Sequence, residues 1–184
     1  MVERLKSEHD AAVEWKPFFL HPEMPPEGIE LPAAIRARMA STHERLLQIA
    51  HTAGLEMVFS ERLPNSRRAL EATEYARAQG KELEFHRVVF RKFYGEGQNI
   101  SRWEVLRAAA QEVGLDADAM RRETESGRYT ADLDAQIEAA YALGIDGVPT
   151  YILNDKYVIV GAQPYEVFKR AIARLESDKK SEMA

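Results

Sequence analysis

The sequence contains no cysteine among its 184 residues. A disulfide, a cysteine-based zinc site and a thiol nucleophile are therefore all excluded as features of this polypeptide. The absence bears most heavily on redox function, because dithiol exchange begins with attack by a thiolate. Any thiol chemistry that the rest of the sequence suggests has to involve a thiol from elsewhere.

Long apolar runs and an excess of positive charge are also missing. No stretch approaches the roughly 18 consecutive apolar residues of a membrane-spanning helix, and residues 1–10 are charged rather than signal-like. The net charge of -5 and the pI near 5.6 disfavour nucleic-acid binding, which needs clustered Lys and Arg. We therefore expect a cytoplasmic protein whose partners include neither nucleic acid nor membrane.

Histidine is scarce, with five residues in the chain. His43 and His51 share one predicted helix, but a spacing of eight residues places them too far apart for joint chelation of a metal. No pair of acidic residues stands out from ordinary helix-surface charge. We expect no metal site and no catalytic residue in these 184 residues.

The middle of the chain has helical periodicity from about residue 32 to residue 141, and we expect no strand to interrupt it. Asn65 and Asp116 are predicted N-caps. Ser101 and Glu104 form a predicted capping box. This region should therefore be a bundle of helices.

The two ends of the chain differ from the middle. Residues 1–10 have the pattern of an amphipathic helix, and residues 13–20 are apolar and β-rich, which predicts a buried strand followed by a proline-rich turn. Thr150–Leu153 and Tyr157–Val160 predict a hairpin, because the intervening Asn154 and Asp155 tolerate positive φ. Pro164 opens a final amphipathic helix.

This order of elements is the thioredoxin arrangement with helices inserted between its halves. We expect an α/β protein with a thioredoxin-like domain formed by residues 1–31 and 139–184. A helical insertion domain would occupy residues 32–138. The first strand and the start of the first helix of such a fold have no counterpart in this sequence.

Several short motifs resemble the FrnE-like branch of the DsbA family of thiol-disulfide oxidoreductases. Each motif is weak alone, but together they cover nearly the whole chain. The matching stretches are Gly147-Val148-Pro149-Thr150, Gly161-Ala162-Gln163-Pro164, Trp15-Lys16-Pro17-Phe18 with the turn that ends at Gly28, Asn65-Ser66, and Phe85-His86 with Phe90.

The resemblance implies a substrate-binding segment made of Gly147, Val148, Pro149 and Thr150. In the family the Val148–Pro149 peptide would be cis, and the backbone there would form a strand edge that accepts an extended peptide or a thiol conjugate. The family's Cys-X-X-Cys motif has no match here. The chain is therefore expected to be redox-inactive as it stands.

Two alternatives remain open. One is the related group of glutathione-dependent 2-hydroxychromene-2-carboxylate isomerases and kappa-class transferases, in which glutathione would be the ligand. The other is a non-catalytic module that binds peptides. In either case the expected partners are thiol or disulfide peptides or glutathione, with no other cofactor.

The absent strand would lie at the centre of a thioredoxin sheet, between residues 13–20 and Thr150–Leu153. Both neighbours would then present unpaired apolar edges. We expect that these two strands close up on each other or that a homodimer covers the gap.

Overall fold

The computed structural model describes residues 2–182, with side chains to Asp178, and contains two compact units. The hairpin unit consists of residues 1–20 and 136–184, and the helical unit consists of residues 21–135. Residues 21–31, which the sequence analysis assigned to the thioredoxin-like half, cluster with the helical unit. None of the described helices is long and apolar enough to cross a membrane.

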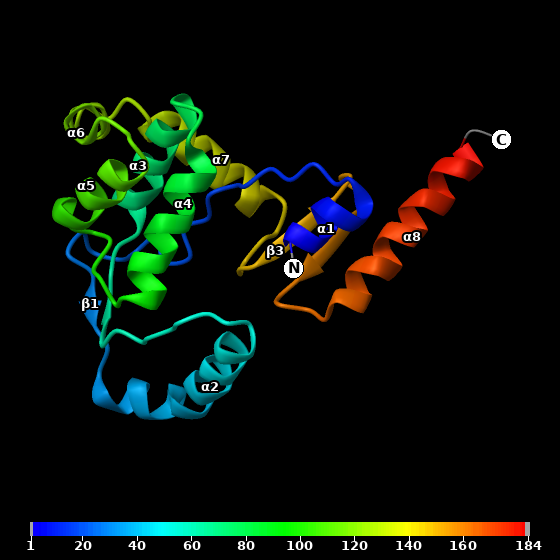
Figure 1. Ribbon diagram of the computed structural model, residues 1–184, viewed down its shortest axis with the longest axis horizontal. Helices are drawn as coiled ribbons and strands as arrows, with labels where there is room; N and C mark the ends of the chain where they lie inside the picture. Colours follow the sequence, from blue (N-terminus) through cyan, green and yellow to red (C-terminus); the bar gives the residue numbers. More distant parts are fainter. Residues whose placement is uncertain (1, 183–184) are drawn as a thin grey trace. The chain divides into compact units, whose positions relative to one another are not determined.

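The helical unit contains most of the helices of the chain (Figure 1). Its last helix, α7, begins in this unit and continues into the hairpin unit. The elements in chain order are β1 (Ile29–Glu30), α2 (Ala33–Thr52), β2 (Arg62–Leu63), α3 (Arg67–Ala78), α4 (Glu82–Phe90), the π-helix η1 (Arg91–Gly95), α5 (Trp103–Glu112), α6 (Ala117–Glu125) and α7 (Thr130–Ala142).

A single apolar core holds α3, α4, α5 and α6 together. Phe85, Leu106 and Met120 are completely buried there, and each comes from a different helix of the bundle. Alanines such as Ala72 allow the helices to approach one another closely. The predicted helical bundle is confirmed, because the apolar residues recur at helical spacing and bury one face of each helix.

The cap of α6 is confirmed and the capping box of α5 is wrong. Asp116 accepts hydrogen bonds from the N–H groups of Asp118 at 3.0 Å and Ala119 at 2.9 Å. Ser101 instead donates its hydroxyl to Asn99 Oδ1 at 2.7 Å, and α5 begins only at Trp103. A local loop formed by Asn99 therefore satisfies the serine that the sequence pattern assigned to the helix.

Asn65 ties the start of α3 to the preceding turn. Its Oδ1 accepts from Arg67 N at 2.8 Å, and its Nδ2 donates to Met24 O at 2.7 Å. The residue adjacent to the helix is Ser66, so Asn65 caps from one position earlier than an N-cap. Buried Asn65 thus satisfies helix and turn together.

The expectation that no strand interrupts the helical region is wrong. β2 pairs antiparallel with β1, with Ile29 opposite Leu63. Two-residue strands carry too little periodicity for a sequence pattern to reveal them. Gly28 permits the pairing, because at φ +71° a Cβ would lie 2.4 Å from Leu63 O.

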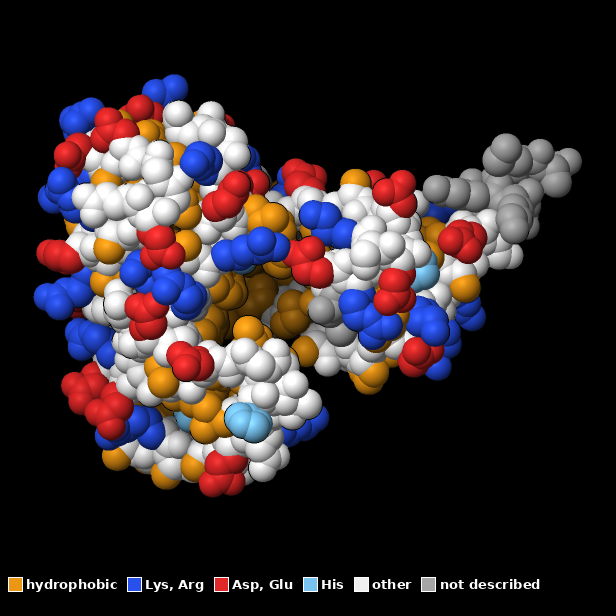
Figure 2. All heavy atoms as spheres, in the orientation of Figure 1, with side chains coloured by type: hydrophobic (Ala, Val, Ile, Leu, Met, Phe, Trp, Pro, Cys, Tyr) orange, Lys and Arg blue, Asp and Glu red, His pale blue; other side chains and the backbone are white. Residues whose placement is uncertain are grey.

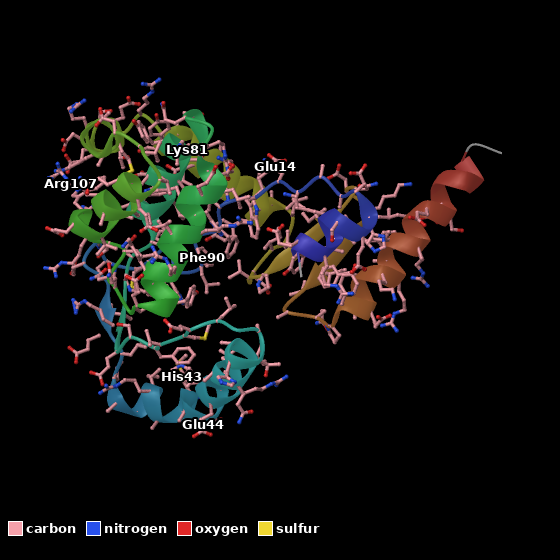
Figure 3. All side chains as sticks on the ribbon, in the orientation of Figure 1. Glu14, His43, Glu44, Lys81, Phe90 and Arg107 are labelled. Carbon is pink, nitrogen blue, oxygen red and sulfur yellow. The ribbon has the colours of Figure 1, made fainter. Side chains whose placement is uncertain are left out.

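Helix α2 makes little use of the bundle core. Ala50 is its buried residue, whereas Ile35, Met39, Leu46 and Ile49 are exposed at helical spacing. Its inner face is held by the chain that follows it. There His43 stacks on Phe59 with ring centroids 3.7 Å apart (Figure 3), and Arg36 pairs with Glu61.

The hairpin unit contains α1 (Val2–His9), β3 (Thr150–Leu153), β4 (Tyr157–Val160) and α8 (Tyr165–Glu182). β3 and β4 pair antiparallel as the sequence predicts, with Thr150 opposite Val160. Asn154 and Asp155 have φ of 49° and 55°, both positive as in a type I′ turn, and Lys156 N–H donates to Leu153 O at 3.1 Å.

The predicted strand at residues 13–20 is wrong. This segment has no strand structure, and Val13 and Trp15 are exposed. Its end is held instead by α7, where Tyr141 donates its hydroxyl to Phe19 O at 2.6 Å and packs edge-on against Phe18. A strand needs a neighbour to pair with, and within the described residues β3 pairs with β4 alone.

The expected closing-up of residues 13–20 onto Thr150–Leu153 is therefore wrong for the described chain. A homodimer that covers the gap beside β3 stays a prediction.

The surface of the helical unit is of mixed charge. Acidic and basic side chains are interspersed over the face that Figure 2 shows.

Candidate functional site

The segment predicted to bind substrate leads directly into β3. Gly147, Val148, Pro149 and Thr150 are consecutive, and the Val148–Pro149 peptide bond is cis. The Val148 side chain is 57% exposed. Thr150 donates its hydroxyl to Gly147 O at 2.8 Å, which braces the loop on either side of Pro149.

The second motif of the resemblance meets the first in space. Gly161 N–H donates to Pro149 O at 2.8 Å. Gln163 fixes the same turn, since its side-chain amide donates to Val160 O at 2.9 Å. The stretches 147–150 and 161–164 are therefore one structural element, although residues 151–160 of the hairpin separate them in the chain.

Among the residues that the structure describes, the outer edge of β3 has no strand paired with it. In an antiparallel pair, bonded and non-bonded residue pairs alternate. The bond from Gly161 N–H to Pro149 O makes that pair a bonded one, so Tyr151 is bonded to Ile159 and the next bonded pair follows two residues later. Consequently the N–H and C=O groups of Thr150 and Ile152 point away from β4.

The hairpin has one covered face and one open face. Tyr151, Leu153 and Ile159 pack with Leu5 of α1 and Phe168 of α8, and burial raises the pKa of the Tyr151 phenol. The alternate residues on the other face are largely exposed. They are Thr150, Ile152 (39% exposed), Val158 (61%) and Val160 (55%).

A hollow of about 160 Å³ lies over this open face. The hairpin supplies an apolar floor, and the chain between α7 and the cis peptide supplies a wall from Leu143 to Asp146. Two carboxylates, those of Asp146 and Asp155, are among the lining residues. None of the described lining residues is Lys or Arg.

The sequence motifs predict the loop but not the hollow. A signal was present, because Thr150, Ile152, Val158 and Val160 occupy alternate positions of the two predicted strands and so share one face. The acidic wall residue Asp146 gave no signal of its own. Among the residues that the structure describes, no three His, Asp or Glu side chains are placed to hold a metal ion.

Solved structures resemble the fold over most of the chain. A 2-hydroxychromene-2-carboxylate isomerase aligns with a TM-score of 0.76 at 22% identity, covering 100% of this chain and 90% of its own. A probable DsbA oxidoreductase, SCO1869 from Streptomyces coelicolor, has a TM-score of 0.78 at 22% identity, covering 86% and 73%. A putative protein disulfide isomerase from Nitrosomonas europaea has a TM-score of 0.74 at 16% identity, covering 96% and 88%. At these identities the likeness establishes a thioredoxin-like fold of the α/β class.

The sequence comparisons establish the family. The protein YwbO of Bacillus subtilis (strain 168) is 31% identical over 173 residues, which cover 92% of this chain and 85% of that protein. The family model described as the DSBA-like thioredoxin domain matches residues 1–173. The chain therefore belongs to the DSBA-like thioredoxin domain family.

Proposed function

We propose that this chain docks an extended peptide, including one that carries a thiol or disulfide, along the outer edge of β3. The observation that carries the proposal is the set of outward-pointing backbone groups on Thr150 and Ile152, next to exposed Val148. A free strand edge binds an extended peptide through main-chain hydrogen bonds, and neighbouring side chains then select its sequence. The substrate-binding residues are Gly147, Val148, Pro149 and Thr150.

The docked peptide is not oxidised or reduced by these 184 residues. Thiol-disulfide exchange needs an attacking thiolate, and the sequence contains no cysteine. The proposed role is therefore to hold a peptide in extended form, and any exchange requires a thiol from another molecule. A cytoplasmic location is part of the proposal and is tested by cell fractionation.

The test is amide protection in the full chain, measured by nuclear magnetic resonance during titration with an extended peptide. The amides of Thr150 and Ile152 should gain protection from exchange. The amide of Tyr151 should change little, because it already bonds to β4. Protection spread evenly over the hairpin, or none, would contradict edge docking. A peptide with alternate N-methylated residues should fail to bind in the register that presents the methyl groups to β3.

A pair of proline variants separates the two edges of the hairpin. Ile152→Pro removes an N–H from the outer edge of β3, and Val158→Pro removes the register-paired N–H from the outer edge of β4. Proline is tolerated on an edge where its missing N–H faces solvent. Ile152→Pro should abolish peptide binding, whereas Val158→Pro should retain it. The reverse result would move the docking site to β4.

Glutathione is the second candidate ligand. It is favoured by the match of the whole chain to a 2-hydroxychromene-2-carboxylate isomerase, because that group is expected to use glutathione. Calorimetry with glutathione and with a cysteine-containing peptide distinguishes the candidates. If the Ile152→Pro variant still releases heat on titration with glutathione, glutathione binds elsewhere. Peptide docking is then judged from the peptide titration alone.

A further inference from the structure

The hollow beside the β3 edge has a shape and charge that select one kind of peptide side chain. Its floor is apolar, since Ile152, Val158 and Val160 present their side chains there. Its charged lining residues are Asp146 and Asp155, both exposed. The hollow therefore combines an aliphatic surface with negative charge at its rim.

The size of the hollow limits what can enter it. Its volume of about 160 Å³ is below the roughly 300–1,000 Å³ of typical small-molecule pockets. We therefore expect it to admit a single side chain of a peptide rather than a whole small molecule.

A side chain with an apolar stem and a cationic head matches both properties. Lys and Arg bury their methylene stems along apolar surface while the charged head stays in contact with water or with an anion. Here the stem would lie on Ile152 and Val158, and the head would reach a carboxylate at the rim. Lys156, a cation of the hairpin turn, is not among the lining residues.

The strand edge brings such a side chain to the right face. Residues directly opposite each other in paired strands point to the same face of the sheet. The peptide residue opposite Ile152 would therefore project over the open face, where the hollow lies. A peptide residue one position along would project over the face covered by α1 and α8, so the selection acts on alternate residues.

We propose that the hollow lined by Asp146, Asp155 and the open face of the hairpin is a specificity pocket for one Arg or Lys of the docked peptide. This inference rests on the proposed docking at β3 and adds the sequence class of the peptide. The two carboxylates are specificity-determining residues and take no part in bond making.

The experiment compares three peptides that differ at one residue. An extended peptide of alternating Val and Thr carries Arg, Met or Glu at its centre, and fluorescence anisotropy measures its binding to the full chain. The Arg peptide should bind about fivefold or more tightly than the Met peptide, as two exposed charge pairs allow. The Glu peptide should bind most weakly. Added salt should reduce the preference for Arg, because the carboxylates are exposed.

Charge-removing variants then assign the preference to the pocket. In the double variant Asp146→Asn with Asp155→Asn, the Arg and Met peptides should bind equally well, at the wild-type affinity for Met. The matched control is the double variant Glu166→Gln with Glu176→Gln, which removes two exposed charges from α8 and should keep the preference. Circular dichroism confirms that each variant is folded.

The outcomes separate the two proposals. If wild type binds all three peptides equally, the specificity pocket is wrong and docking at β3 stands. If the double variant keeps the preference for Arg, the pocket is also wrong, because the selecting charge lies elsewhere. If wild type binds none of the peptides, docking at β3 fails and the pocket fails with it.

Discussion

The helical bundle and the hairpin unit each bury one phenylalanine completely, but they surround it very differently. Phe85 lies in a core shared by α3, α4, α5 and α6. Phe168 lies in a smaller cluster with Leu5 and Ile159, and that cluster covers one face of the hairpin. The bundle is closed around its core, whereas the hairpin keeps a face and an edge available. The proposed binding site belongs to the unit that is less completely covered.

The largest expected effects come from truncating the two phenylalanines separately. Phe85→Ala and Phe168→Ala should each cost about 3–5 kcal/mol, because both side chains are fully buried. In denaturant unfolding monitored by circular dichroism, Phe85→Ala should lower the denaturant concentration at which most of the helix signal is lost. Phe168→Ala should lower only the transition of the hairpin unit. If either substitution shifts both units together, the two are one cooperative structure and the comparison does not hold.

A second, smaller contrast concerns two tyrosines that donate to carboxylates. In the bundle, burial and then the hydrogen bond to Glu123 raise the pKa of Tyr129 to about 12. In the hairpin unit, the pKa of Tyr157 is also raised, and the hydrogen bond to Asp178 is the largest cause. A raised phenol pKa stabilises the fold fully below the ordinary value of 10, and the stabilisation is lost as pH rises through the folded value.

We therefore expect bundle stability to decline between pH 10 and about 12. Tyr129→Phe should reduce this decline and remove one late-titrating phenol from an ultraviolet pH titration. Tyr157→Phe is the matched variant in the other unit and should leave the late step in place. Retention of that step in Tyr129→Phe would assign it to another tyrosine.

The smallest expected effects come from substitutions of residues that cap a helix or form a turn. Asn154→Ala should weaken the hairpin by about 1 kcal/mol, because a side chain with no local hydrogen bond disfavours φ of 49°.

Asp116→Ala should destabilise the bundle at neutral pH. Hydrogen bonds from the backbone N–H groups of Ala119 and Asp118 lower the pKa of Asp116. Its stabilisation is present above the ordinary value of 3.8 and is lost as pH falls through the folded value.

Thermal unfolding at several pH values measures both variants. Asp116→Asn should keep the cap at every pH, since its amide oxygen still accepts hydrogen bonds, and should remove this pH dependence. Asn154→Ala should lower the stability of the hairpin unit more than that of the bundle. A larger loss of stability in the bundle would mean that the turn does not control the hairpin.

The parts of the fold that sequence predicts well are those determined by neighbours in the chain. The turn at Asn154 and Asp155 and the cap at Asp116 depend on residues within a few positions, so the local pattern contains the answer. The failed strand at residues 13–20 depends on a distant pairing partner that a one-dimensional pattern cannot supply. The β1–β2 pair failed for the same reason, because it joins segments more than thirty residues apart.

The candidate site likewise contains one part that the sequence predicts and one part that depends on tertiary structure. The loop from Gly147 to Thr150 was found through motif resemblance. The hollow depends on the wall from Leu143 to Asp146 lying over the hairpin face, which is a tertiary arrangement. The role proposed for Asp146 could be recognised only when the strand register and that wall were seen together.

Helix α2 has a consequence for how the molecule fluctuates. In folded proteins a helix owes most of its stability to packing of an apolar face rather than to intrinsic propensity, and regions with few buried contacts open at low free energy. With Ala50 as its buried residue and Ile35, Met39, Leu46 and Ile49 exposed, we expect α2 to have a helix–coil balance of its own. Any surface that covers those four side chains would shift that balance toward helix while leaving the bundle unchanged.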